Sequence, residues 1–182
     1  MILGITGTNG AGKGTVVDYL VEKKGFNHYS SSGFITEEIV RREMPINRDS
    51  MRIVGNDLRQ LNSPSYVVET NYGRALAAGG DAVLDSVRTI GESEFLKSKN
   101  VPIIAVDADR KTRYERVVVR GSAKDKVSFE EFCIQEDKEM AQTAANEMNI
   151  GTVMKMADYT LHNDGTLEDL HAQIEEMLSQ LV

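Results

Sequence analysis

The sequence predicts an α/β fold in which a five-stranded parallel sheet is flanked by helices in three layers. Short apolar runs alternate along the chain with apolar patterns of helical spacing, which is typical of a parallel sheet with crossover helices. A glycine-rich stretch at residues 7–15 joins the first apolar run to the first helical pattern. The chain has 182 residues, enough for a full core, so we expect residues 1–182 to form a single domain.

The pattern begins with a strand, a helix and a second strand. We predict a strand over residues 2–6, an apolar run, and a helix over residues 14–24, where apolar residues fall on one helical face. Gly25 ends this helix. Residues 26–30 predict a second strand, although the polar Asn27 and His28 interrupt its apolar pattern.

Residues 31–80 have a different character, with helical patterns and no convincing strand. A first helix closes at Pro45. A second begins after Asn47, which can cap it, and a third begins near Pro64 and ends at residues 79–80. We expect this helical insertion to hold a substrate.

Strands and helices alternate again after residue 80. Further strands are predicted over residues 82–84, 101–106 and 158–163. Further helices are predicted over residues 91–99, 112–120 and 128–146, with a last one after residue 166. Ser128 with Glu131, and Thr166 with Asp169, match capping boxes at the starts of the last two. Residues 121–127 are polar and short, and we expect them to form a lid loop.

The composition narrows the class of protein. Hydrophobic residues make up 41% and charged residues 27% of the chain, which is ordinary for a globular protein. The formal net charge of −7 argues against a non-specific nucleic-acid binder and against binding to an anionic membrane. The single cysteine, Cys133, excludes an internal disulfide and a cysteine-based zinc cluster. No apolar run is long enough to span a membrane, and the chain enters a core strand at Ile2, so we expect a cytoplasmic enzyme without a signal peptide.

Residues 7–15 read Gly-Thr-Asn-Gly-Ala-Gly-Lys-Gly-Thr and follow the spacing of a phosphate-binding loop. Glycines let backbone N–H groups converge on phosphate oxygens, and the helix N-terminus adds partial positive charge. Lys13 can reach the β and γ phosphates of a nucleoside triphosphate. Gly14 occupies the usual Ser/Thr position, so Thr15 must supply the hydroxyl that ligates Mg²⁺. The residues expected to contact the triphosphate are Gly7, Asn9, Gly10, Ala11, Gly12, Lys13, Gly14 and Thr15.

Asp85 and Arg88 form a second candidate group at the end of the third predicted strand. An acidic residue there lies at the ligand edge of a parallel sheet and can hold Mg²⁺ through water. Arg88 is expected at the same edge, where a guanidinium suits bidentate phosphate binding. A strand-end cap and a surface arginine are the alternative interpretations.

Arg116 and Arg120 form a third group. They are four residues apart on a predicted helix and therefore share a face. Two arginines facing phosphates would stabilise the charge on a transferring phosphoryl group. A solvated helix face beside Glu115 is the alternative.

These motifs together resemble the adenylate-kinase family. Gly-Lys-Gly-Thr at residues 12–15 is similar to that family's loop, and Asp-Ser-Val-Arg at residues 85–88 is similar to its Asp-Gly-Phe-Pro-Arg stretch. Residues 115–120 resemble the two arginines that flank the family's lid. The resemblance implies a P-loop NTPase fold, ATP as donor, Asp85 serving Mg²⁺ and Arg88 gripping an acceptor phosphate. One lid arginine would lie against the ATP base, the other on the phosphates.

The C-terminal run at residues 157–170 looks more like dephospho-coenzyme A kinases, a related family. In both families the loop after the last strand borders the adenine. The resemblance therefore implies that Asp164 and Gly165 contact ATP, together with Arg116.

The acceptor side departs from both families. Thr36 stands where adenylate kinases carry an arginine after the second strand. The candidates to replace that arginine are Arg41, Arg42 and Arg48, of which Arg48 at a helix start is preferred. The paired acids of dephospho-coenzyme A kinases are replaced by three serines that begin at Ser30. We therefore expect Ser30, Arg48 and Arg88 to contact the acceptor.

The sequence thus predicts an ATP-dependent nucleotide kinase that transfers the γ-phosphoryl group to a nucleoside or deoxynucleoside monophosphate. The residues expected to neutralise charge during transfer are Lys13, Arg88, Arg116 and Arg120. A dephospho-coenzyme A kinase and a non-catalytic ATP-binding module are the alternatives. The acceptor base and sugar and the oligomeric state stay open.

Overall fold

The computed structural model describes residues 1–121, 127–141 and 147–181, apart from the side chains of Arg48 and Ala141. Within these residues five parallel strands form one sheet in the order β2-β3-β1-β4-β5. The strands are β1 (Ile2–Gly7), β2 (Asn27–Ser30), β3 (Ala82–Asp85), β4 (Ile103–Asp107) and β5 (Tyr159–His162). The predicted five-stranded parallel sheet is confirmed.

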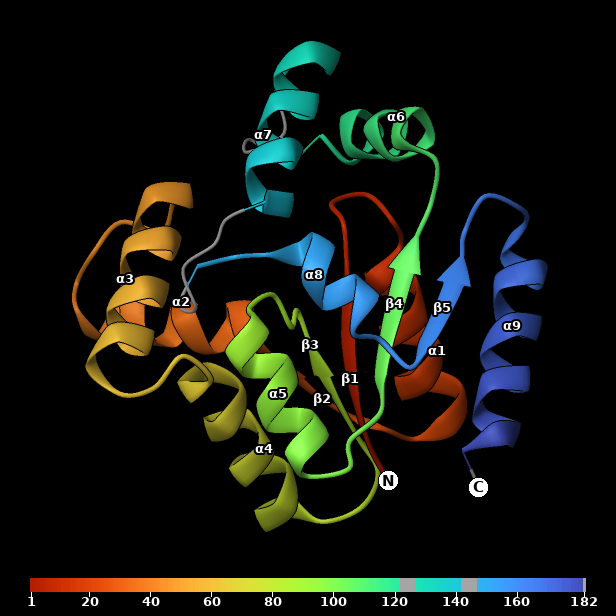
Figure 1. Ribbon diagram of the computed structural model, residues 1–182, viewed down its shortest axis with the longest axis horizontal. Helices are drawn as coiled ribbons and strands as arrows, with labels where there is room; N and C mark the ends of the chain where they lie inside the picture. Colours follow the sequence, from red (N-terminus) through yellow and green to blue (C-terminus); the bar gives the residue numbers. More distant parts are fainter. Residues whose placement is uncertain (122–126, 142–146, 182) are drawn as a thin grey trace.

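Helices cover both faces of this sheet (Figure 1). One face packs against α1 (Lys13–Lys24) and α9 (Leu167–Gln180). The other packs against α4 (Tyr66–Ala78), α5 (Ile90–Ser98) and α8 (Ile150–Lys155). Both faces of the sheet are therefore buried, each in its own apolar core. Along β3, Val83 belongs to the core under α1 and α9, whereas Ala82 and Leu84 belong to the core on the opposite face.

The three helices between β2 and β3 have a small core of their own. They are α2 (Ser31–Arg41), α3 (Arg48–Leu61) and α4. Five buried apolar side chains fill the space between them: Ile35, Ile39, Val54, Leu58 and Val67. The side chains of Ser30 and Asn47 cap α2 and α3 by accepting hydrogen bonds from the backbone N–H groups of Gly33 and Ser50. The predicted helical insertion is confirmed.

Two helices lie beyond the carboxyl ends of the strands, α6 (Arg110–Arg120) and α7 (Phe129–Ala141) (Figure 1). The sequence predicted a single helix over residues 128–146, but α7 ends at Ala141 and residues 142–146 lie outside the described part. The short helix α8 was missed, because six residues are too few to show a helical period. Most of the expected lid, residues 122–126, also lies outside the described part.

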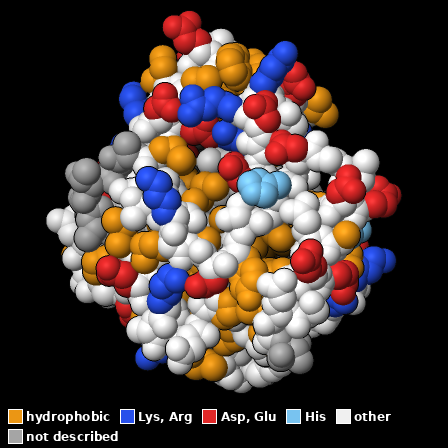
Figure 2. Space-filling view, turned by 45° about the vertical axis from the view of Figure 1, so that its right-hand side comes forward, with side chains coloured by type: hydrophobic (Ala, Val, Ile, Leu, Met, Phe, Trp, Pro, Cys, Tyr) orange, Lys and Arg blue, Asp and Glu red, His pale blue; other side chains and the backbone are white. Residues whose placement is uncertain are grey.

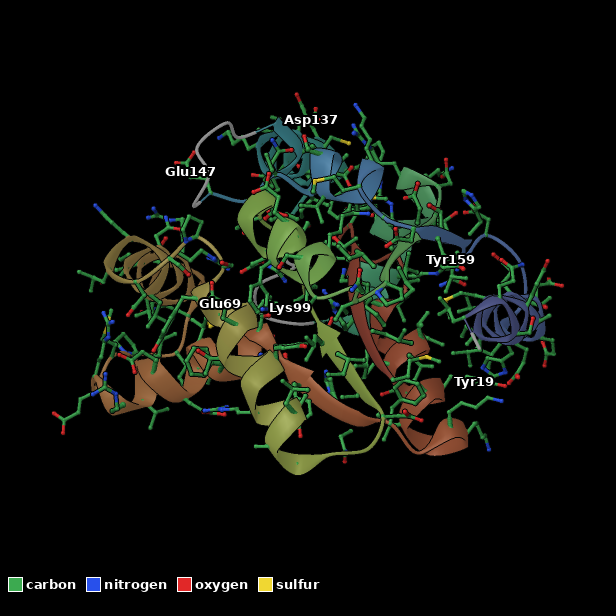
Figure 3. The ribbon with its side chains drawn as sticks, turned by 60° about the horizontal axis from the view of Figure 1, so that its bottom comes forward. Tyr19, Glu69, Lys99, Asp137, Glu147 and Tyr159 are labelled. Atoms are coloured by element: carbon green, nitrogen blue, oxygen red, sulfur yellow. The ribbon has the colours of Figure 1, made fainter. Side chains whose placement is uncertain are left out.

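The surface carries charges of both signs. Figure 2 shows Lys and Arg side chains interspersed with Asp and Glu side chains on the face that it presents. Tyr19 of α1 lies beside α9 (Figure 3), where its ring centroid is 4.2 Å from that of His171. No described helix combines the length and the apolar character that crossing a membrane requires.

Candidate functional site

The site is built around the loop that joins β1 to α1. Gly12 caps α1 in the left-handed conformation, with φ 99°, and Gly10 has φ 81°. A Cβ atom at Gly12 would overlap the side-chain amide of Asn163, and one at Gly10 would overlap the backbone oxygen of Arg113. These glycines are therefore required by backbone conformation and by close neighbours from distant segments.

Lys13 is held inside the loop. Its Nζ atom donates hydrogen bonds to the backbone oxygens of Gly7 and Thr8, each at 2.8 Å. Burial, followed by the charge of Arg88, lowers the pKa of the Lys13 ammonium to about 8, against the opposing charges of Asp85 and Glu139. The ammonium thus points toward the loop interior and lies in electrostatic range of the β3 end.

Asp85 ends β3 and lies next to β2. Its Cα is the register partner of Ser30, so both side chains stand at the same edge of the sheet. Burial alone raises the pKa of the Asp85 carboxyl, but the His28 imidazole and the Lys13 charge outweigh it and lower the pKa. His28 Nε2 lies 3.6 Å from Asp85 Oδ2, while Asp85 Oδ1 is buried without a hydrogen-bond partner among the described residues.

A small cation would find few protein ligands at this edge. Among the described residues, no three His, Cys, Asp or Glu side chains are grouped as a metal site would need. Asp85 Oδ1 is a candidate oxygen ligand, and the Thr15 hydroxyl is the candidate that the sequence adds. With two protein oxygens, a cation would be coordinated mainly by water and phosphate, as is usual for Mg²⁺.

Arg88 follows β3 in a turn where Ser86 has a positive φ of 68°. Its backbone oxygen accepts a hydrogen bond from the N–H of Asn149 at 2.9 Å. Its Nη1 atom lies 3.7 Å from the sulfur of Met148, a weak acceptor. A guanidinium with a weak partner, close to Lys13, is placed to bind an anion.

The two arginines of α6 reach the loop from the other side. Arg116 Nη2 donates to the backbone oxygen of Asn163 at 2.8 Å, and its Nη1 atom is buried without a partner among the described residues. Arg120 Nη2 donates to Asn9 Oδ1 at 3.1 Å. Arg120 thus contacts the phosphate-binding loop, and Arg116 contacts the segment that follows β5.

The loop after β5 completes this side. Asn163 Nδ2 donates to the backbone oxygen of Ala11 at 2.9 Å, which ties residues 163–165 to the phosphate-binding loop. Asp164 Oδ1 accepts from the backbone N–H of Asp109, at the start of α6. Sequence reasoning chose Asp164 and Gly165 but missed Asn163, because a contact with Gly12 across 151 positions leaves no local signal.

Arg113 was also missed. It is buried on α6 and donates to the backbone oxygens of Ala108 at 2.8 Å and Asn9 at 3.4 Å. It also forms an ion pair with the buried Glu136 of α7. Arg113 therefore braces the phosphate-binding loop against α7, whose Phe132 and Glu136 line a small cavity over that loop.

A groove of about 720 Å³ opens between α2 and α3, on the β2 side of Asp85. Seven residues line it: Ser30, Ser32, Gly33, Thr36, Glu37, Val40 and Met51. Thr36, at the position of the adenylate-kinase arginine, donates to the backbone oxygen of Ser32 at 2.8 Å. Arg41 and Arg42 are engaged by Glu38, and the Arg48 side chain lies outside the described part.

The chain is similar in sequence to a family of known proteins. A family model described as an AAA domain matches residues 3–144. The UPF0200 protein TK1334 of Thermococcus kodakarensis is 30% identical, and the match covers 100% of this chain and 98% of that protein. A UPF0200 protein of Sulfurisphaera tokodaii is 31% identical, with 100% of this chain and 97% of that protein covered.

Solved structures share the fold at lower identity. TT1252 from Thermus thermophilus has a TM-score of 0.62 and 22% identity, covering 100% of this chain and 98% of that chain. A shikimate kinase from Acinetobacter baumannii in complex with shikimate has a TM-score of 0.61 and 15% identity, covering 99% and 92%. At these identities the likeness concerns the fold, which is P-loop kinase-like.

Proposed function

Because the chain belongs to the UPF0200 family and carries an AAA domain within a P-loop kinase-like fold, we propose that it is an ATP-dependent phosphotransferase acting on a small molecule. The observation that supports this most is that α6 brings two guanidinium groups to this site. Arg120 Nη2 donates to Asn9 Oδ1 in the loop at 3.1 Å, and Arg116 has a buried Nη1 atom without a partner among the described residues. The charges of Arg88 and Asp85 at the β3 end and of Glu139 on α7 also act on the Lys13 ammonium.

In the proposed reaction ATP is the donor. Loop N–H groups and Lys13 hold the β and γ phosphates, and Arg88, Arg116 and Arg120 neutralise the charge that spreads over the transferring phosphoryl group. Asp164 and Gly165 border the adenine. The unpartnered Nη1 atom of Arg116 supports this arrangement, because a buried guanidinium nitrogen is stabilised by an anionic or carbonyl partner.

Mg²⁺ fits the oxygen atoms present at this edge. The buried Asp85 Oδ1, which has no hydrogen-bond partner among the described residues, could accept from metal-bound water, and the Thr15 hydroxyl could ligate the metal directly. The ion would supply neutralisation of phosphate charge.

For the acceptor we propose a nucleoside or deoxynucleoside monophosphate. Its phosphate would meet Arg88, and its sugar and base would occupy the groove that begins at Ser30. A phosphate acceptor is already anionic, so it requires no general base.

We also propose that residues 1–182 act as one domain, that residues 31–80 bind the acceptor with a contact from Arg48, and that residues 121–127 close as a lid.

One observation favours a second candidate, a hydroxyl acceptor as in dephospho-coenzyme A kinases. The lining of the groove is rich in neutral hydroxyl groups, and its charged member, Glu37, is already paired with Arg74. Such a lining offers no free cation to a phosphate, whereas its hydroxyl groups would form hydrogen bonds with a hydroxyl acceptor.

A coupled assay of ADP release tests the proposal, with Mg-ATP and a panel of nucleoside monophosphates plus dephospho-coenzyme A. We expect a monophosphate to accelerate ADP release. Lys13→Ala should lower kcat at least about 100-fold with the fold intact, whereas Lys23→Ala, an exposed control on the same helix, should keep wild-type rates. Acceleration by dephospho-coenzyme A alone would select the second candidate. Binding of ATP without acceleration by any acceptor would leave only a non-catalytic module.

A further inference from the structure

Two buried charged side chains lie behind Arg88, outside the loop and the groove. Glu92 on α5 is 0% exposed and Arg59 on α3 is 6% exposed. Arg59 Nε and Nη2 lie 3.1 and 2.8 Å from Glu92 Oε1. The pair joins α3 to α5, and its two residues are 33 positions apart in the sequence.

The other oxygen of the same carboxylate holds the backbone next to Arg88. Glu92 Oε2 accepts hydrogen bonds from the N–H groups of Arg88 at 2.8 Å and Thr89 at 3.1 Å. The Thr89 hydroxyl in turn accepts from the Glu92 N–H at 3.1 Å, which completes a capping box at the start of α5. One carboxylate therefore receives four donors, two from α3 and two from the turn that carries Arg88.

A capping box alone does not explain this arrangement. The capping boxes at Ser128 and Thr166 have exposed glutamate or aspartate partners. Glu92 is instead fully buried and bound to a guanidinium, an arrangement that carries a large desolvation cost. What this arrangement adds is a fixed link between α3, whose Met51 lines the groove, and the Arg88 turn.

We propose that Glu92 and Arg59 are positioning residues for Arg88. Their ion pair fixes the backbone of Arg88 relative to α3, so that the guanidinium meets an anion bound beside the carboxyl end of β3. The inference rests on the proposed function, since it gives Arg88 an acceptor phosphate to bind.

The test is a titration of the 182-residue protein, saturated with Mg-ADP, with inorganic phosphate as the probe. Chemical-shift changes of the backbone N–H signals of residues 88–92 report binding, so the same readout serves every variant. The double variant Arg59→Met/Glu92→Gln removes both buried charges, so neither is left uncompensated. We expect it to fold, to bind ADP as the wild type does, and to bind phosphate about tenfold more weakly. The single variant Arg59→Lys keeps the positive charge and Glu92, so it should retain most of the wild-type phosphate affinity.

Lys97→Met is the matched control, because it removes an exposed ion pair with Asp158 from the same helix. It should leave phosphate affinity unchanged. If the pair were purely structural, the double variant would have a lower melting temperature and would bind both ADP and phosphate more weakly. That result would overturn the proposal, and so would wild-type phosphate affinity in the double variant. Arg88→Ala separates the role of Arg88 from that of the ion pair. If both Arg88→Ala and the double variant bind phosphate like the wild type, Arg88 does not bind the acceptor phosphate. If Arg88→Ala weakens phosphate binding and the double variant does not, only the positioning role of Glu92 and Arg59 fails.

Discussion

Gly12 and Gly14 stand two positions apart in the phosphate-binding loop but face different constraints. Gly12 has φ 99° and lies against the Asn163 amide, whereas Gly14 has an ordinary φ and no neighbour within 4 Å of the point where a Cβ atom would lie. The sequence pattern treats both simply as loop glycines. Their difference arises from the left-handed cap of α1 and from the chain segment after β5.

We therefore predict opposite effects of alanine on the stability of the nucleotide-free protein. Gly12→Ala should lower the free energy of unfolding by about 1–3 kcal/mol, because it strains the backbone and displaces Asn163. Gly14→Ala, the matched control inside α1, should be neutral or stabilising by up to about 1 kcal/mol. Urea unfolding of both variants measures this, and equal destabilisation would contradict the role given to Asn163.

We expect Lys13 to make nucleotide binding depend on pH. Its pKa of about 8 lies below the ordinary value, because burial and Arg88 disfavour the charged form. A bound phosphate chain favours the charged form and raises the pKa again. Near pH 8 part of the free protein holds a neutral Lys13, so ADP binding should take up protons.

Calorimetry in buffers of different ionisation enthalpy measures this uptake. We expect a fraction of a proton per ADP near pH 8 and almost none attributable to Lys13 at pH 6.5, where the free protein already holds the proton. In Lys13→Met the excess near pH 8 should vanish. Its persistence there would assign the uptake to another group.

At the scale of elements, α7 is tied to the phosphate-binding loop through one buried residue of α6. Arg113 contacts the backbone of Asn9 and pairs with Glu136 of α7. Arg110, at the start of α6, also reaches Glu136 at 2.7 Å. Helix α7 is thus coupled to the shape of the loop, although it contributes no residue to the predicted motifs.

Glu136→Gln should be strongly destabilising, by about 3–5 kcal/mol, because it leaves the buried Arg113 without its charged partner. Asp137→Asn is the matched control on the next position. Asp137 lies at the outer edge of the molecule (Figure 3) and pairs there with Arg110, so its loss should cost less than about 1 kcal/mol. Thermal unfolding of both variants checks the contrast, and similar melting temperatures would argue against the brace.

At the scale of the whole molecule, the candidate site gathers segments from the full length of the chain. The carboxyl ends of β1, β3 and β5 and the helix α6 meet at one edge of the sheet, with α6 and α7 beyond it (Figure 1). Parallel strands with crossover helices bring these ends together whatever their separation in sequence. We therefore expect a ligand bound at this edge to stabilise the fold as a whole.

Mg²⁺ should add to that stabilisation. ADP should raise the melting temperature, and Mg²⁺ should raise it further, since a ligand at 100 times its Kd contributes about 2.7 kcal/mol. Asp85→Asn should reduce the Mg²⁺-dependent part and keep the part due to ADP alone. Asp81→Asn, at the opposite end of β3, should change neither. An unchanged Mg²⁺ increment in Asp85→Asn would exclude Asp85 from the metal site.

Local patterns predicted most of the fold, because the period of apolar residues, caps and glycines depends on near neighbours. The five strands, the helical insertion and the phosphate-binding loop all follow from such patterns, as does the shared face of Arg116 and Arg120. Many boundaries moved by one or two residues, as at α4, which begins at Tyr66 rather than in the turn at Pro64. The ends of α2 and α7 moved further.

The sequence by itself thus determined the parallel α/β architecture and the loop, since both are written in short-range spacing. Only the tertiary structure decided the strand order, the contact of His28 with Asp85, the packing of Asn163 on Gly12, and the link from Arg59 through Glu92 to Arg88. These features depend on contacts between residues that lie tens to more than a hundred positions apart in the sequence. Burial and charge in the folded chain determine such contacts, and no local pattern of residues predicts them.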